Sequence, residues 1–202
     1  MSILINGEEK RLGLALSGGG FRAAAFHLGV FRKLQELRLL EKIDLFSCVS
    51  GGSIAGAFLC SRWGKPDALD QLESYLSTRS IAVSTIASGL LSPFSTRLDK
   101  LAQSYERDLF GDKPLSSLRN GPRIYINTTN LSTGNMISFI AGGGDATEMG
   151  DHELSFQKAD DFDISTAVAA SSAFPPAYPP LQLRQDKFTI KMRAWLAVPR
   201  PF

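Results

Sequence analysis

Hydrophobic residues in the first third of the chain alternate between short apolar runs and helical spacing. Residues 12–17 form an apolar run typical of a buried parallel strand, and three glycines follow it. From Phe21 onward, apolar positions recur with the 3.6-residue period of a helix that packs one face on a sheet. Residues 45–49 form a second apolar run before another small-residue helix. This pattern predicts an α/β fold, a mostly parallel sheet flanked by helices.

The same reading extends along the rest of the chain. The spacing predicts surface helices over residues 66–79 and 98–110, and a pair of strands over 123–128 and 136–141. A small-residue helix is predicted over 164–173, with Asp163 as its N-cap. Prolines in residues 174–180 predict a rigid extended loop, because proline cannot continue a helix.

Residues 80–96 carry no charge, although serine and threonine separate their apolar side chains. This composition fits a partly buried helix and loop that covers the core. It also fits a mobile flap, or a surface that enters a lipid interface. Both interpretations stay open.

The turn after the second strand resembles a nucleophile elbow, in which a serine lies between small residues on a sharp strand-to-helix turn. The favoured nucleophile is Ser53, since small residues lie two positions before and after it. The elbow comprises Gly51, Gly52, Ser53, Ile54 and Ala55. Ser50 is a rival with a poorer fit, because Cys48 lies two positions before it. A plain turn with Ser53 as N-cap is the structural alternative.

The glycine triplet before the first helix adds a second element of the same chemistry. Gly18, Gly19 and Gly20 end the neighbouring strand, so their N–H groups can face the elbow as an oxyanion hole. Arg22, in the first turn of the helix, steadies this loop, meets a phosphate, or is simply a solvated surface residue.

These two motifs together resemble the patatin-like phospholipase family, and the likeness continues in residues 123–129 and 167–176. It covers about residues 12–183, so we interpret residues 1–202 as a single patatin-like domain. The resemblance implies hydrolysis of acyl esters in phospholipids or other lipids, with Ser53 as nucleophile and Gly18 to Gly20 as the oxyanion hole.

The tail departs from the family pattern. Members of the family pair the nucleophilic serine with an aspartate, in a Ser–Asp dyad. This aspartate lies in an Asp-Gly dipeptide after a strand that matches residues 187–190, but no Asp-Gly dipeptide occurs in this sequence. Residues 191–202 are not family-like. We therefore interpret the domain as truncated before its Asp-bearing segment, and expect little turnover from the chain alone.

Two other functions are consistent with parts of the sequence. A non-catalytic remnant that keeps the fold and lipid contact is consistent with the missing aspartate. A dinucleotide-binding domain is suggested because Gly18, Gly20 and Ala23 match the G-x-G-x-x-A fingerprint. That domain also needs an acidic residue at the end of the next strand, whereas Glu41 and Asp44 precede it.

The composition indicates which classes of partner and ligand to expect. A chain with 44% hydrophobic and 21% charged residues predicts one globular domain, and a net charge of +2 argues against nucleic acid as partner. Two cysteines and two histidines predict neither a disulfide framework, a metal site nor a cofactor. His27 is expected to be a packed core residue.

The polar N-terminus and the lack of an 18-residue apolar run predict a cytoplasmic protein without a transmembrane segment, with peripheral membrane contact at most.

Overall fold

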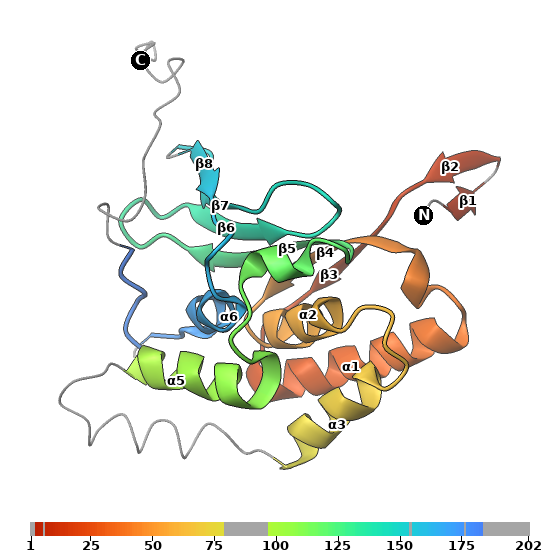
Figure 1. Ribbon diagram of the computed structural model, residues 1–202, viewed down its shortest axis with the longest axis horizontal. Coiled ribbons are helices and arrows are strands. Elements are labelled where there is room, and N and C mark those ends of the chain that lie inside the picture. Colours follow the sequence, from red (N-terminus) through yellow and green to blue (C-terminus); the bar gives the residue numbers. More distant parts are fainter. Residues whose placement is uncertain (1–2, 6, 79–96, 154, 176, 184–202) are drawn as a thin grey trace, which may run out of the picture.

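The computed structural model describes residues 3–5, 7–78, 97–153, 155–175 and 177–183 of the 202-residue chain (Figure 1). The strands are β1 Ile3–Ile5, β2 Glu8–Lys10, β3 Leu12–Leu16, β4 Ile43–Val49, β5 Arg123–Thr129, β6 Met136–Ala141, β7 Glu148–Asp151 and β8 Ser155–Lys158. The helices are α1 Gly20–Glu36, α2 Gly51–Ser61, α3 Ala68–Thr78, α5 Arg97–Tyr105 and α6 Ile164–Ser172. Short 3-10 helices span Leu40–Lys42 and Leu115–Leu118, and a π-helical turn spans Glu106–Phe110.

Strands β3 to β8 form one six-stranded sheet in sequence order, while β1 and β2 form a separate hairpin. The pairs β3–β4 and β4–β5 are parallel, and the remaining pairs are antiparallel. Helix α1 lies in the first parallel crossover, and α2, α3 and α5 lie in the second. The predicted α/β class is confirmed, with β3, β4 and β5 as a parallel core flanked by helices. The sheet as a whole is mixed, because β6 to β8 return as a meander.

Helix α2 occupies the centre of the helical layer. Every residue from Gly51 to Cys60 is buried, since α2 packs against β3, β4 and β5 and also against α1, α3 and α6. In the view of Figure 1 the labelled helices lie on the lower side of the sheet, with α2 and α6 next to it. The small residues predicted for this helix therefore serve close packing on all sides.

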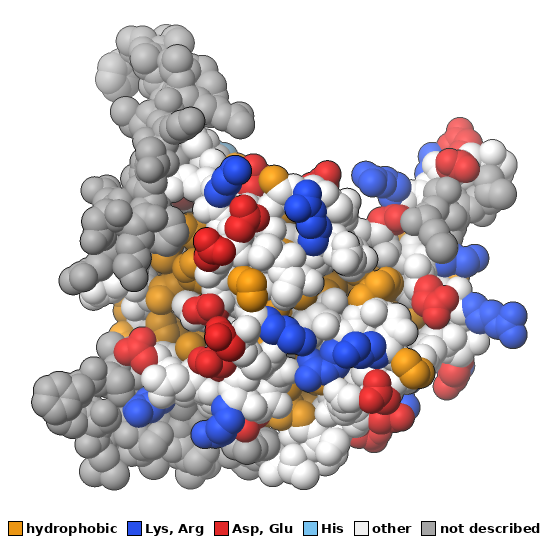
Figure 2. Space-filling view, viewed as in Figure 1, with side chains coloured by type: hydrophobic (Ala, Val, Ile, Leu, Met, Phe, Trp, Pro, Cys, Tyr) orange, Lys and Arg blue, Asp and Glu red, His pale blue; other side chains and the backbone are white. Residues whose placement is uncertain are grey.

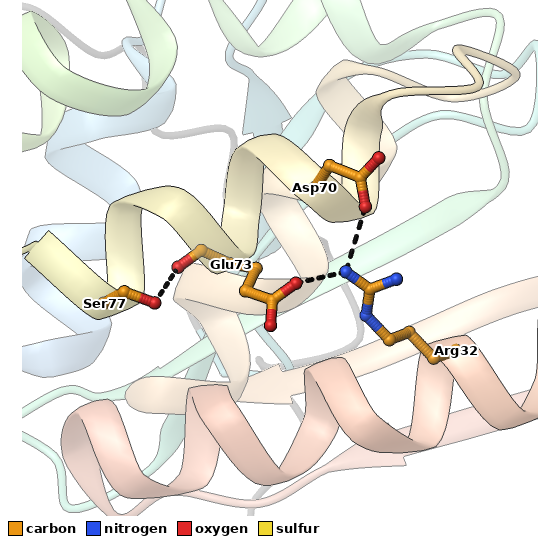
Figure 3. Close-up of polar contacts among 4 residues, drawn as sticks. All are labelled: Arg32, Asp70, Glu73 and Ser77. Atoms are coloured by element: carbon orange, nitrogen blue, oxygen red, sulfur yellow. Dashed lines mark hydrogen bonds and ion pairs between the residues drawn. The ribbon is translucent and has the colours of Figure 1, made fainter.

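The outer helices show the expected amphipathic pattern. Helix α1 buries Ala24, His27, Leu28 and Phe31, which recur at helical spacing on one face. On its outer face Arg32 bonds Asp70, at 2.9 Å, and Glu73 of α3, while the Ser77 hydroxyl donates back to the Glu73 carbonyl (Figure 3). Such exposed ion pairs add little stability, so the apolar contacts hold α3 on α1.

Most elements predicted from spacing occur close to their expected bounds. Helix α3, strands β5 and β6, and helix α6 with Asp163 at its N-cap position agree with the prediction to within two residues. The helix predicted over 98–110 divides into α5 and the π-helical turn. Strands β7 and β8 were not predicted. The uncharged stretch 80–96 and the strand expected over 187–190 lie outside the described residues.

Three glycines of α2 allow its backbone to lie directly on neighbouring main chain and on Cys48. A Cβ atom on Gly51 would lie 2.1 Å from the carbonyl oxygen of Gly20, and one on Gly52 would lie 2.3 Å from that of Leu16. On Gly56 it would lie 2.5 Å from the Sγ of Cys48. No side chain fits at these distances, so glycine at these positions sets how closely α2 approaches β3 and β4.

We expect Gly52→Ala to destabilise the fold by about 1–3 kcal/mol, because main chain of β3 would have to move away from α2. The matched control is Gly29→Ala in the exposed face of α1, where an added Cβ meets nothing within 4 Å. That change should stabilise the protein by about 0.5–1 kcal/mol, since alanine is the better helix former. Urea unfolding of both variants measures the difference, and equal effects would refute the packing argument.

Candidate active site

Ser50 lies at the sharp corner between β4 and α2. Its backbone has φ 53° and ψ −117°, a left-handed conformation that residues with a side chain rarely adopt. Residues held in such conformations cluster at functional sites, because the surrounding structure must hold them there. The side chain of Ser50 is only partly buried, so a substrate can approach it.

Ser53 lies one turn further along, inside α2. It is 0% exposed, and its N–H donates to the carbonyl of Ser50 at 2.8 Å. Ser50, not Ser53, therefore holds the N-cap position and the corner. The residues predicted as the elbow, 51–55, all lie within the buried helix. The geometry of an elbow fits the rival Ser50, with Gly52 as the small residue two positions after it.

Cys48 takes the position two before Ser50, where a small residue was expected. It is buried, and its sulfur lies in the space left by the missing side chain of Gly56. Burial raises the pKa of the Cys48 and Cys60 thiols well above the usual value, so both stay protonated at neutral pH. A protonated buried thiol is a poor nucleophile, which leaves the chemistry of this corner to a serine.

The glycine loop lies against Ser50. A Cβ on Gly18 would lie 3.3 Å from the Cβ of Ser50 and equally close to the Val49 side chain. Gly19 and Gly20 have φ of 137° and 63°, and α1 begins at Gly20. The N-termini of α1 and α2 consequently meet beside Ser50. The N–H groups at the very start of each helix, such as those of Gly51 and Gly52 in α2, have no acceptor within their own helix, so this place favours negative charge.

Two further residues of α1 bear on this loop. The Nε2–H of buried His27 donates to the carbonyl of Ser17, at 3.0 Å, directly before Gly18. His27 therefore packs in the core as expected and also anchors the start of the glycine loop. Arg22 is exposed in the first turn of α1 and forms no ion pair with another described residue.

Sequence reasoning missed the part played by Ser171 in α6. Its hydroxyl contacts the N–H of Ser50 at 2.9 Å, the hydroxyl of Ser53 at 2.8 Å and the carbonyl of Asn127 at 2.6 Å. The Asn127 side chain in turn links Ser47 to Ser138 across three strands. Both residues lie in the later blocks, 123–129 and 167–176, that carry the family likeness, and this was the one signal available.

A groove of about 1070 Å³ begins beside the corner, at Val49, Asn127 and Ser171. It continues along strands β5 to β8, and Ala173, Pro175, Tyr178 and residues 180–183 complete its mainly apolar lining. The exposed side chains of Leu131 and Met136, each 63% exposed, stand among its lining residues. This volume is at the upper end of ordinary ligand pockets, and the groove can take a long apolar group.

The described residues bring no base to either serine. No described carboxylate or imidazole is hydrogen-bonded to Ser50 or Ser53. Buried Asp151 lies in β7, three strands from β4, which is about 14 Å across a sheet. Asp44, considered above for a dinucleotide, lies near the amino end of β4, and its carboxylate accepts the N–H of Leu12 at 2.9 Å. It cannot reach a ligand at the glycine loop.

The described residues were also compared with the patterns of metal sites, membrane-spanning helices and nucleic-acid-binding surfaces. Within them, no group of three or more His, Cys, Asp or Glu side chains is placed to hold a metal ion. No described helix is both long and apolar enough to cross a bilayer. Figure 2 shows basic and acidic side chains interspersed over the face drawn there, without the single-sign surface typical of nucleic-acid binding.

Comparison with known proteins gives a family match. A family model described as patatin-like phospholipase matches residues 14–190. A search of curated proteins finds no significant match.

Two similar solved structures are of human GIVD cytosolic phospholipase A2 in complex with methyl γ-linolenyl fluorophosphonate, one of them also with terbium chloride. They are 21% and 22% identical to this chain, with TM-scores of 0.56 and 0.57. Each covers 80% of this chain, which spans only 29% of theirs. At this identity the likeness concerns the fold.

Proposed function

Since this chain belongs to the patatin-like phospholipase family, we propose that it provides the nucleophile and the oxyanion site for hydrolysis of acyl esters in phospholipids or other lipids. The observation that carries the proposal is the strained corner at Ser50, with the glycine loop directly against it. We assign the nucleophile to Ser50 in place of Ser53, because a fully buried hydroxyl inside α2 cannot reach a substrate carbonyl.

The chemistry follows from this arrangement. The Ser50 Oγ attacks the ester carbonyl carbon and gives its proton to a base, and the negative charge forms on the former carbonyl oxygen. N–H groups of Gly18, Gly19 and Gly20 and of the first turn of α2 stabilise that oxygen. Collapse of the intermediate breaks the ester bond, the alcohol leaves with the proton, and the acyl group stays on Ser50. Water then attacks the acyl-enzyme and releases the fatty acid.

The base belongs to a segment outside the described residues. Relatives that follow the family pattern use the aspartate of an Asp-Gly dipeptide, which this sequence lacks. A serine without a base retains only what the oxyanion site and substrate binding supply. By analogy with serine proteases stripped of their triad, that is about 10³–10⁴-fold over water. We expect the 202-residue chain on its own to turn over slowly.

The groove supports a substrate whose acyl group, released at the end as the fatty acid, is a long chain. It starts at Val49 and Ser171, next to Ser50, and its mainly apolar lining suits a hydrocarbon chain. Each methylene group buried there contributes about 0.8 kcal/mol. The fluorophosphonate bound to the human phospholipase structures carries a linolenyl chain, so it is a suitable probe of both features.

A catalytically inactive remnant that keeps the fold and lipid contact is the second candidate. The observation that favours it is that, among the described residues, neither Ser50 nor Ser53 is hydrogen-bonded to a carboxylate or an imidazole. The two candidates differ in whether supplying that base produces an enzyme.

The decisive experiment replaces residues 191–202 with a family-like segment that begins Asp-Gly-Gly. Turnover of a chromogenic acyl ester should then rise by about 10³-fold or more over the unaltered chain, since Ser50 gains its base. Changing only the new aspartate to alanine should remove this gain while circular dichroism stays unchanged. No gain in a folded chimera would favour the inactive remnant.

In the active chimera we expect Ser50→Ala to abolish turnover, because it removes the attacking oxygen. Ser53→Ala is the comparison: it removes a hydroxyl three residues away that does not attack the substrate, so turnover should fall by no more than about 10-fold. Steady-state rates on a short-chain ester test both. Activity that survives Ser50→Ala but not Ser53→Ala would return the assignment to Ser53.

Filling the groove should change the chain-length preference of the same chimera. Ile137→Trp, in the lining at the start of β6, is expected to lower kcat/KM for a hexadecanoyl ester about 10-fold and leave a butanoyl ester nearly unaffected. Leu37→Trp adds the same ring after the C-terminus of α1, away from the groove lining, and should change neither value. Equal losses on both esters would contradict the acyl-groove assignment.

A further inference from the structure

The hydroxyl of Ser171 joins three parts of the fold that are distant in sequence. It lies 2.9 Å from the amide nitrogen of Ser50, 2.8 Å from the hydroxyl of Ser53 and 2.6 Å from the carbonyl oxygen of Asn127. These groups come from the corner, from the first turn of α2 and from β5. One partly buried side chain of α6 thus contacts the corner, α2 and β5 together.

The direction of each hydrogen bond follows from the available protons. A carbonyl can only accept, so the single proton of Ser171 goes to Asn127. Both lone pairs of the Ser171 oxygen then accept, one from the N–H of Ser50 and the other from the hydroxyl of Ser53. All bonding capacity of Ser171 is used, and the buried hydroxyl of Ser53 has a defined role as a donor.

The bridge lies where the ladder between β4 and β5 ends. The last paired residues are Val49 and Asn127, and the chain turns away at Ser50. The Ser171 hydroxyl links the N–H of Ser50 to the carbonyl of Asn127, and so replaces a further ladder bond. A left-handed conformation at a non-glycine residue is unfavourable and needs such an outside contact to hold it.

We propose that Ser171 is a positioning residue that fixes the peptide before Ser50, and that Ser53 is the donor that holds Ser171 in place. Removing the Ser171 hydroxyl frees the N–H of Ser50 and the Ser53 hydroxyl together. The corner then relaxes, and the Ser50 side chain loses its fixed direction toward the glycine loop. The effect on catalysis rests on the proposed function, whereas the hydrogen bonds of Ser171 can be measured without turnover.

The first measurement uses amide hydrogen exchange of the unaltered 202-residue chain. The N–H of Ser50 should exchange at least about 10-fold more slowly than an unstructured amide, although it lies at a partly exposed corner. Exchange of Ser50 at the unstructured rate would overturn the proposal whatever the variants do.

The second measurement compares variants in the same chain. Ser171→Ala should raise the exchange rate of the Ser50 amide at least about 10-fold while amides within β4 and the middle of α2 keep theirs. Ser171→Thr keeps a hydroxyl and should retain the protection. Ser172→Ala, the same change at the next residue of α6, is the control and should leave Ser50 unchanged. Unchanged exchange in folded Ser171→Ala would refute the bridge.

A third measurement separates this inference from the proposed function. The rate at which methyl γ-linolenyl fluorophosphonate labels the chimera with the Asp-Gly-Gly segment should fall at least 10-fold when Ser171→Ala is introduced and recover with Ser171→Thr. If the exchange results hold but the parent chimera is labelled elsewhere than Ser50, or not at all, the proposed nucleophile fails and the positioning role stands. Labelling of Ser50 at equal rates in the parent chimera and its Ser171→Ala variant would refute the role in reactivity.

Discussion

The direct packing of α2 on neighbouring main chain is the contact on which the rest of the site depends. Gly51 and Gly52 leave no room for a side chain against Gly20 and Leu16, so two backbone segments meet without an intervening layer. This contact brings the start of α2 to the start of α1. It also forces the chain to turn at Ser50 in a left-handed conformation. The strained corner, its glycine loop and the two helix N-termini are therefore consequences of one close approach.

The sequence allowed the architecture around this contact to be predicted, because apolar runs and helical spacing report directly on burial. Strands β3, β4 and β5 and helices α1 and α2 follow those patterns. Strands β7 and β8 do not, since they have four residues each and contain polar side chains that are held by pairing with β6 and with each other. Short segments of this kind gain their structure from the sheet and not from local pattern.

The choice between Ser50 and Ser53 was beyond the sequence for a related reason. Small residues flank both, and the corner's position depends on which glycine meets Gly20, a contact over thirty residues along the chain. Cys48 counted against Ser50 because its size was considered without the space that Gly56 provides. Ser171 is over one hundred residues from the corner, and no periodicity marks a hydroxyl that bridges two strand ends.

The chemistry proposed here depends on which serine reacts, because the nucleophile is assigned to the corner and the base to a segment outside the described residues. To identify that serine, the chimera that carries the Asp-Gly-Gly segment is labelled with methyl γ-linolenyl fluorophosphonate, and the adduct is located by tandem mass spectrometry. We expect phosphonylation of Ser50, with Ser53 unmodified. An adduct on Ser53 would contradict it, as would an intact Ser50 in a chimera that hydrolyses esters.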